Sequence, residues 1–224
     1  MSAVTSSATD RDPYHVGHGH GHGHGRDEAT GHGEGGPASK RIVTGYGFWI
    51  FLLSDIIMFS AFFAAYAVLK DSTAGGPTGR DLFDLRLTML ETACLLASSF
   101  ACGMATLAAE ARRASWFQIA MAATFVFGAA FIYLELSEFW ELVERGAGPS
   151  RSAFLSSFFT LVGCHGLHVT GGLLWLLTMM AQIFAFGFRP NILRRFYCFS
   201  LFWHALDIIW VALFTVVYLL GVAP

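Results

Sequence analysis

The residues of this sequence that could do chemistry are the acids and histidines that interrupt its long apolar stretches. A charged side chain in the middle of a membrane-spanning helix costs about 2.5–3.5 kcal/mol on insertion scales, so each such residue is a functional candidate by default. Beyond the first 41 residues, eight of them lie within apolar stretches or at their ends: Asp55, Glu91, Glu135, Glu138, His165, His168, His204 and Asp207.

Six of these residues form pairs whose members are three positions apart. In a helix this spacing places both members on one face. We favour an interhelical hydrogen-bond network, in which the polar groups neutralise one another or stay protonated. The pairs are Glu135/Glu138, His165/His168 and His204/Asp207.

A dimetal centre is a second interpretation of the same pairs. An E-x-x-E, an H-x-x-H and an H-x-x-D together resemble the carboxylate–histidine centres of some helical bundles. Such a centre would make the chain an enzyme in its own right. Against it, Glu135 and Glu138 are expected near the outer interface, whereas His204 and Asp207 fall in the inner half to the middle of their stretch.

A proton relay is the third interpretation, because intramembrane acids and histidines also form proton paths. Asp55 is the best candidate, since it stands alone in its apolar stretch, nearer the expected cytoplasmic side. The structural alternative is a protonated Asp55 that bonds to Ser54, Ser60 or a neighbouring helix.

The elements that must position these residues follow from composition. The chain has 224 residues, of which 54% are hydrophobic and only 13% are charged. Soluble domains carry about 25% charged residues, so this chain has too few to coat a soluble globule. A net charge of -2 does not indicate a polyanionic partner, and we expect no nucleic-acid binding. The four cysteines include no C-x-x-C pair, which argues against a disulfide framework or a zinc site.

Five apolar stretches are each long enough for the roughly 20 residues that cross a bilayer. They are continuously apolar rather than alternating, which favours helices over a barrel. We therefore predict an all-α integral membrane bundle of five transmembrane helices within residues 42–224. The approximate spans are 48–69, 87–109, 116–137, 154–186 and 196–222.

Orientation follows from the Lys and Arg residues of the loops, which gather on the cytoplasmic side. The side of the N-terminal tail carries nine of them, and the opposite side carries five. This predicts a cytoplasmic N-terminus and a periplasmic C-terminus.

Residues 1–41 form a Gly/His-rich tail in which nothing can bury a core, so we predict disorder. No apolar segment precedes Gly45, and we expect no cleavable secretory signal. A hydrophilic, weakly pH-responsive tail is the favoured interpretation. Transient copper or zinc binding is the alternative, with four alternating imidazoles as the ligands: His18, His20, His22 and His24.

The sequence also lacks the features of a redox protein. It has no C-x-x-C-H, Walker or G-x-G-x-x-G motif, and only three histidines lie in the spans, fewer than haem and copper centres need. A polar interior without an evident redox centre indicates an accessory subunit with no catalytic residue and no metal site of its own.

Four motifs resemble subunit III of the haem–copper oxidases. They are GFWIFLLSD at 47–55, LSEF at 136–139, GCHGLHV at 163–169 and WHALDIIW at 203–210. Within this family the chain is most similar to the cytochrome o ubiquinol oxidase type, which has five helices, a His-rich start and a loop like the TAGGPTG of residues 73–79. The resemblance covers essentially everything after the tail.

The resemblance implies a function. Subunit III carries no cofactor and packs beside subunit I, which holds haem b, haem o and copper, in a complex with subunits II and IV. It supports the stability of subunit I and proton entry, while the complex oxidises ubiquinol, reduces dioxygen to water and pumps protons across a bacterial inner membrane. A bound phospholipid is a further expectation.

The chain departs from the family pattern in two respects. It lacks two N-terminal helices that help form the lipid-holding cleft of the mitochondrial type, and Asp55 stands where the cytochrome c branch usually has Glu. The alternatives are a cytochrome c oxidase subunit III, a nitric oxide reductase accessory protein and, more remotely, the stand-alone dimetal enzyme.

Overall fold

The computed structural model describes residues 40–222, and every regular element in that range is helical. The elements are α1 (Lys40–Leu69), α2 (Gly79–Leu82), α3 (Leu85–Glu110), α4 (Ala114–Glu144), α5 (Ala153–Phe186), α6 (Pro190–Leu213), the π-helix η1 (Phe214–Leu219) and α7 (Leu220–Val222). Five helical segments are long and apolar enough to cross a membrane. The prediction of an all-α protein with five such helices is confirmed. The predicted tail, apart from its last two residues, lies outside the described range.

The helices are longer than the apolar stretches that predicted them. α4 continues to Glu144 instead of ending at Ser137, and Glu141 forms an ion pair with Arg145 beyond the apolar part. α6 begins at Pro190 instead of Phe196, with the proline in the first turn, where no backbone N–H is needed. A run of apolar residues marks the part of a helix that lies in the hydrocarbon. It does not mark the polar turns by which the helix extends at either end.

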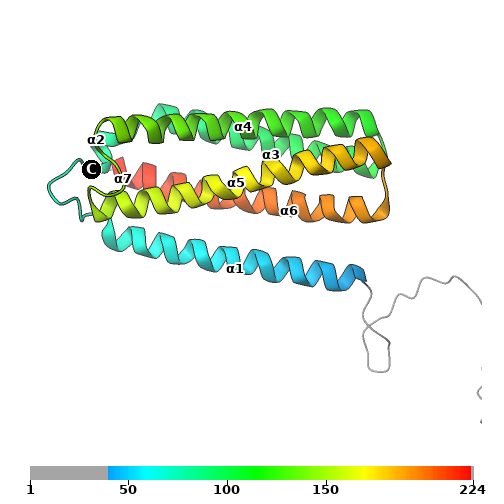
Figure 1. Ribbon diagram of the computed structural model, residues 1–224, viewed down its shortest axis with the longest axis horizontal. Helices are drawn as coiled ribbons and strands as arrows, with labels where there is room; N and C mark the ends of the chain where they lie inside the picture. Colours follow the sequence, from blue (N-terminus) through cyan, green and yellow to red (C-terminus); the bar gives the residue numbers. More distant parts are fainter. Residues whose placement is uncertain (1–39, 223–224) are drawn as a thin grey trace, which may run out of the picture. The chain divides into compact units, whose positions relative to one another are not determined.

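Local capping chemistry sets several helix ends. The Asp84 carboxylate accepts a hydrogen bond from the Arg86 backbone N–H at 2.9 Å, and the Ser152 hydroxyl accepts one from the Leu155 N–H at 3.2 Å. α5 ends at Phe186 and is followed by Gly187, whose φ of 68° suits glycine. The connections between these helices are short, so each of α3, α4, α5 and α6 runs antiparallel to the helix before or after it in the chain (Figure 1).

α3, α4, α5 and α6 lie side by side lengthwise around one interior, and α1 lies against α5 and α6 (Figure 1). α2 and α7 sit at one end of this bundle, where the described chain also ends (Figure 1). The start of α1 and the α3–α4 and α5–α6 connections lie at the opposite end (Figure 1).

The buried positions of α3 and α4 repeat with alternating spacings of three and four residues. This is the pattern of helices that pack at a shallow, left-handed crossing angle. In α4 the buried positions are Phe117, Met121, Thr124, Gly128, Phe131, Glu135, Glu138 and Leu142. Two of the acids therefore occupy interior positions of a regular packing stripe.

Two glycines allow the helices to close on an indole ring. A Cβ added to Gly172 of α5 would lie 2.8 Å from a ring carbon of Trp203, and one added to Gly128 of α4 would lie 3.1 Å from the same ring. The Trp203 indole N–H donates a hydrogen bond to the Ser98 hydroxyl of α3 at 3.1 Å. Trp203 thus packs against all the other helices of the bundle.

α1 buries only one narrow stripe. Its buried side chains are Leu52, Phe59 and Tyr66, which are seven residues apart and so share a face. The opposite face is apolar but open, with Ile57 69% exposed and Val68 79% exposed.

Candidate functional site

The eight residues predicted from the sequence lie in several separate groups in the structure. Glu91 of α3 and Glu135 and Glu138 of α4 form what we call the buried acid cluster. They are 0%, 3% and 5% exposed, respectively. The three carboxyl groups are close enough to repel one another if charged. Because charge is costly to bury in an apolar interior, the arrangement favours neutral carboxylic acids.

Hydrogen bonding in the buried acid cluster is incomplete. The Tyr218 hydroxyl of η1 donates to Glu138 Oε2 at 3.1 Å. Within the described residues, neither carboxyl oxygen of Glu91 nor Oε1 of Glu138 has a hydrogen-bond partner. Glu135 reaches α5 where Gly166 leaves space, since a Cβ there would lie 2.7 Å from Glu135 Oε1.

His165 lies in an aromatic pocket next to this cluster. It is fully buried, its ring centroid is 5.2 Å from that of Trp210, and Phe59 and Phe131 pack on it edge-on. Neither ring nitrogen has a hydrogen-bond partner among the described residues. A neutral imidazole held in this way fills the core.

His168 also packs on Phe59 of α1, and it approaches Asp55 of the same helix. His168 Nε2 lies 3.9 Å from Asp55 Oδ2, and Nδ1 lies 2.7 Å from the Cys164 carbonyl oxygen. A carbonyl can only accept, so Nδ1 carries a hydrogen and Nε2 is the ring nitrogen that faces Asp55. The hydroxyls of Ser54 and Ser60 donate to the backbone carbonyls of Phe51 and Ile56 in their own helix.

His204 and Asp207 form the third place, on α6. His204 Nδ1 lies 3.8 Å from Asp207 Oδ2 and 2.7 Å from the Ser99 hydroxyl of α3. The His204 side chain is 41% exposed, whereas that of Asp207 is 10% exposed. This pair ties α6 to α3 at the edge of the bundle.

Among residues 40–222, no hydrogen bonds join these places into one network. The i,i+3 spacing keeps Glu135 and Glu138 together. It also lets His165 and His168 both pack on Phe59 of α1, but His165 then packs on Trp210 of α6 whereas His168 approaches Asp55. In residues 40–222, no three His, Cys, Asp or Glu side chains are grouped so as to hold a metal ion. The ligand geometry that the dimetal interpretation requires is not found there. The histidines proposed as tail ligands lie outside the described residues.

Sequence reasoning missed Tyr218. It is fully buried, donates to Glu138 and is carried by a π-helix, an element that recurs at functional sites. No motif in the sequence marks a π-helix, and a tyrosine near the end of an apolar stretch is typical of an interface anchor.

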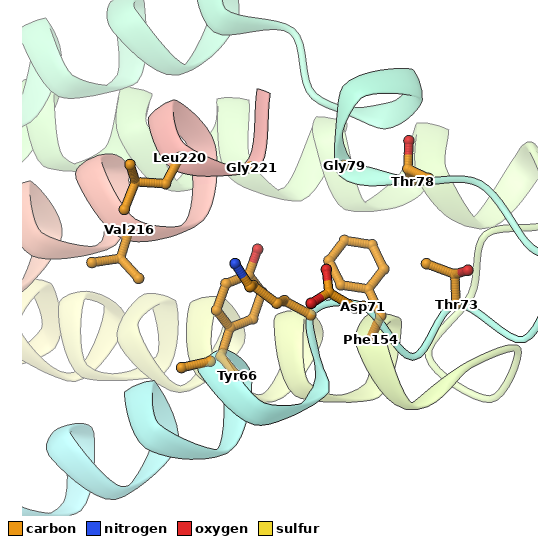
Figure 2. A pocket seen from close by; sticks show the side chains of 11 residues that line it. Tyr66, Asp71, Thr73, Thr78, Gly79, Phe154, Val216, Leu220 and Gly221 are labelled. Atoms are coloured by element: carbon orange, nitrogen blue, oxygen red, sulfur yellow. The ribbon is translucent and has the colours of Figure 1, made fainter. Parts of the chain in front are cut away.

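Sequence reasoning also missed a cavity of about 730 Å³ at the end of the bundle that carries α2 and α7. Figure 2 shows Tyr66 and Asp71 on one side, with Val216 and Leu220 across from them. Lys70 also lines it, so the cavity combines charged and apolar walls. Polar and apolar surfaces of this kind suit an amphipathic molecule.

Comparisons with known proteins agree with the fold. The family model described as cytochrome c oxidase subunit III matches residues 26–222. Similar relatives are named cytochrome bo(3) ubiquinol oxidase subunit 3, one from Pseudomonas aeruginosa, 50% identical over 94% of each chain, and one from Pseudomonas putida, 50% identical over 80% of this chain and 87% of the relative. A cytochrome c oxidase subunit 3 from Bacillus sp. is 42% identical over 78% of this chain and 84% of its own. The chain belongs to the cytochrome c oxidase subunit III family.

Proposed function

We propose that this chain is subunit III of a ubiquinol oxidase, a complex that oxidises ubiquinol, reduces dioxygen to water and pumps protons. The observation that carries the proposal is the 50% identity, over 94% of both chains, to a protein named as subunit 3 of such an oxidase. The likeness extends over 94% of the chain and is not confined to the motifs around the buried acids.

The role we propose is support of the catalytic subunit I rather than catalysis. Haem b, haem o and copper belong in subunit I, and this chain carries no redox centre. Subunits II and IV complete the complex. The large apolar side chains exposed on every long helix, such as Ile57 and Phe184, are surfaces that partner subunits and lipid can cover.

The chain is a multi-pass membrane protein, and we place it in a bacterial inner membrane. We propose a cytoplasmic N-terminus and a periplasmic C-terminus, because nine Lys and Arg residues lie on the tail side and five on the other. The end of the bundle with α2 and α7 would then face the periplasm.

Proton entry is the specific contribution that we propose for Asp55 and His168. Their side chains are 14% and 22% exposed, so each is mostly buried but keeps some contact with the surroundings of the chain. The pair lies between α1 and α5 and has one proton to exchange between Oδ2 and Nε2. A proton that moves between the two groups turns a neutral acid and imidazole into a carboxylate and an imidazolium, and the pair as a whole stays uncharged.

Lipid and metal binding are smaller parts of the proposal. The cavity lined by Lys70, Asp71 and Leu220 suits a phospholipid headgroup and the start of its chains. The alternating histidines of the tail would bind copper or zinc only transiently. Nucleic acid is not an expected partner.

A cytochrome c oxidase subunit III is the second candidate, and the 42% identical relative from Bacillus sp. favours keeping it. The donor is chosen by partner chains, so this chain's own residues distinguish the two only through overall likeness. A nitric oxide reductase accessory protein and a stand-alone dimetal enzyme have no comparable support.

Purification of the native complex through a tag on this chain tests the proposal. We expect haem b, haem o and copper to co-purify, with oxygen consumption driven by ubiquinol and not by reduced cytochrome c. Activity with cytochrome c alone would favour the second candidate. Failure to co-purify with any haem protein, or stoichiometric iron in the isolated chain, would overturn the accessory-subunit role.

A further inference from the structure

Glu138 occupies a boundary position in the buried acid cluster. It is 5% exposed, and its Oε2 accepts the hydrogen bond from Tyr218. Its other oxygen, Oε1, has no hydrogen-bond partner in the described part of the chain. One oxygen of this carboxyl group is therefore fixed by the protein, and the other is buried without a hydrogen-bond partner among the described residues.

A second, smaller cavity reaches Glu138 from the end of the bundle that carries α2. It has a volume of about 80 Å³ and is lined by Leu82, Asp84, Leu87, Glu138, Glu141, Leu142 and Arg145. Because one water needs roughly 10–15 Å³ by this measure, the cavity has room for several. The exposed residues Asp84, Glu141 and Arg145 form its mouth, and Glu138 lies at its buried side.

The π-helix explains how a donor reaches Glu138 from the last membrane-spanning segment. The wider turn of η1 points Tyr218 into the core while Val216, two residues earlier, lines the large cavity. Tyr218 packs on Phe83 and Trp210, at 4.9 Å and 6.3 Å between ring centroids. These contacts hold the hydroxyl at one oxygen of Glu138.

The titratable groups around Glu138 come from several helices. Glu91 and Tyr218 face it from α3 and η1, Glu135 is one turn away on α4, and Asp84 and Glu141 lie near its open side. Arg145 lines the same cavity, although its guanidinium pairs with Glu141. On the α5 side, His165 is buried among aromatic rings and has no hydrogen-bond partner among the described residues.

We propose that Glu138 is a proton-exchange site that connects the buried acid cluster to the α2 end of the bundle through this small cavity. In the step, a hydronium ion in the cavity gives its proton to the Glu138 carboxylate. A carboxylic O–H bond forms, and a water molecule is left. No electron moves, and Tyr218 keeps its own proton.

This site differs from the Asp55–His168 pair in both place and access. Asp55 and His168 join α1 to α5, whereas Glu138 faces α3 and η1 inside the bundle. The cluster would store protons at the end opposite the start of α1. The inference concerns only this chain's residues and does not depend on which electron donor the complex uses.

Infrared spectroscopy of the purified complex tests the proposal, because the C=O stretch of a protonated carboxyl group is resolved from the amide bands and shifts in D₂O. We expect Glu138→Gln to remove one component of this band. In the unsubstituted complex, that component should shift soon after transfer to D₂O. Tyr218→Phe should move it to higher wavenumber, since the hydrogen bond to Oε2 is lost.

Two further variants make the result decisive. Glu144→Gln changes an exposed acid of the same helix and should leave both the band and its exchange unchanged. Leu87→Phe fills the cavity, so exchange must wait for local opening, and we expect it to slow by at least about tenfold. A band that Glu138→Gln leaves intact, or that never exchanges in the folded complex, overturns the proposal. Exchange unaffected by Leu87→Phe overturns the proposed route.

Discussion

α1 contacts the rest of the described molecule through one stripe of side chains, whereas α3, α4, α5 and α6 enclose a shared interior. The stripe is centred on the buried residues Leu52, Phe59 and Tyr66, and Phe48 and Phe51 beside it contact Trp175 and Phe202. The interior contains whole aromatic side chains, among them Trp203 and Trp210, which are each 1% exposed. Within a bilayer the hydrophobic effect does not drive helices together, so the packed area and its fit decide how firmly each helix is held. α1 is therefore expected to separate more easily than any helix of the bundle.

Two phenylalanines give the largest expected effect and test this comparison directly. Phe131 of α4 and Phe59 of α1 are 0% and 2% exposed, and both pack on His165. Removal of a buried phenylalanine costs about 3–5 kcal/mol in protein cores. We expect Phe131→Ala to lower the thermal unfolding temperature of the whole subunit. Phe59→Ala should mainly release α1, which limited proteolysis in residues 71–78 would detect.

The comparison fails if Phe59→Ala lowers the unfolding temperature as much as Phe131→Ala does without added proteolysis. Leu53→Ala is a suitable control on α1, because Leu53 is 53% exposed. It should change neither measurement.

Adjacent glycines of α5 give the next largest effect. A Cβ at Gly172 would lie 2.8 Å from the Trp203 ring, whereas one at Gly171 would meet nothing within 4 Å. We expect Gly172→Ala to destabilise the subunit by about 1–3 kcal/mol through overpacking. Gly171→Ala should be neutral or slightly stabilising. Thermal unfolding of the two variants gives the comparison, and equal effects would contradict the close packing of the bundle around Trp203.

Tyr218→Phe has a smaller expected effect on stability. It removes one buried hydrogen bond to Glu138 and keeps the ring contacts, and such bonds between membrane helices average about 0.6 kcal/mol. Tyr197→Phe, at a position 41% exposed on α6, is the matched control. A small fall in the unfolding temperature for the first variant only is the expected result, and an equal fall for both would count against a structural hydrogen bond.

The smallest effect is expected for the coupling between Asp55 and His168. The 3.9 Å separation exceeds a hydrogen bond, so a double-mutant cycle with Asp55→Asn and His168→Gln should give about 0.6 kcal/mol or less. The same cycle with Ser99→Ala and His204→Gln, across a 2.7 Å contact between α3 and α6, should give more. The reverse order would show that α1 is held by polar contact rather than by its apolar stripe.

Much of the fold follows from the sequence for a simple reason. Five long apolar stretches must become helices in lipid, because only an internally bonded backbone can cross the bilayer. The helix ends were harder to predict from the sequence, as α4 and α6 show. Polar turns outside the hydrocarbon carry no apolar signal.

The candidate site could be predicted only in part from the sequence. The chemical types and spacing of the acids and histidines singled out the right helices to examine, and Glu135 and Glu138 do share one buried stripe. The spacing of His165 and His168 did not indicate that one packs on Trp210 while the other meets Asp55. Tyr218 and its π-helix left no sequence signal.

The sequence by itself determined that this protein lies in a membrane, that five helices form there, and which few polar residues interrupt them. The tertiary structure decided which face of each helix is inside. In a soluble protein the apolar face identifies the interior, but here the outward faces are equally apolar because they meet lipid. Only the packing of α3 against α4, and of both around Trp203 and Tyr218, places the acids in a shared interior beside the small cavity that ends at Glu138.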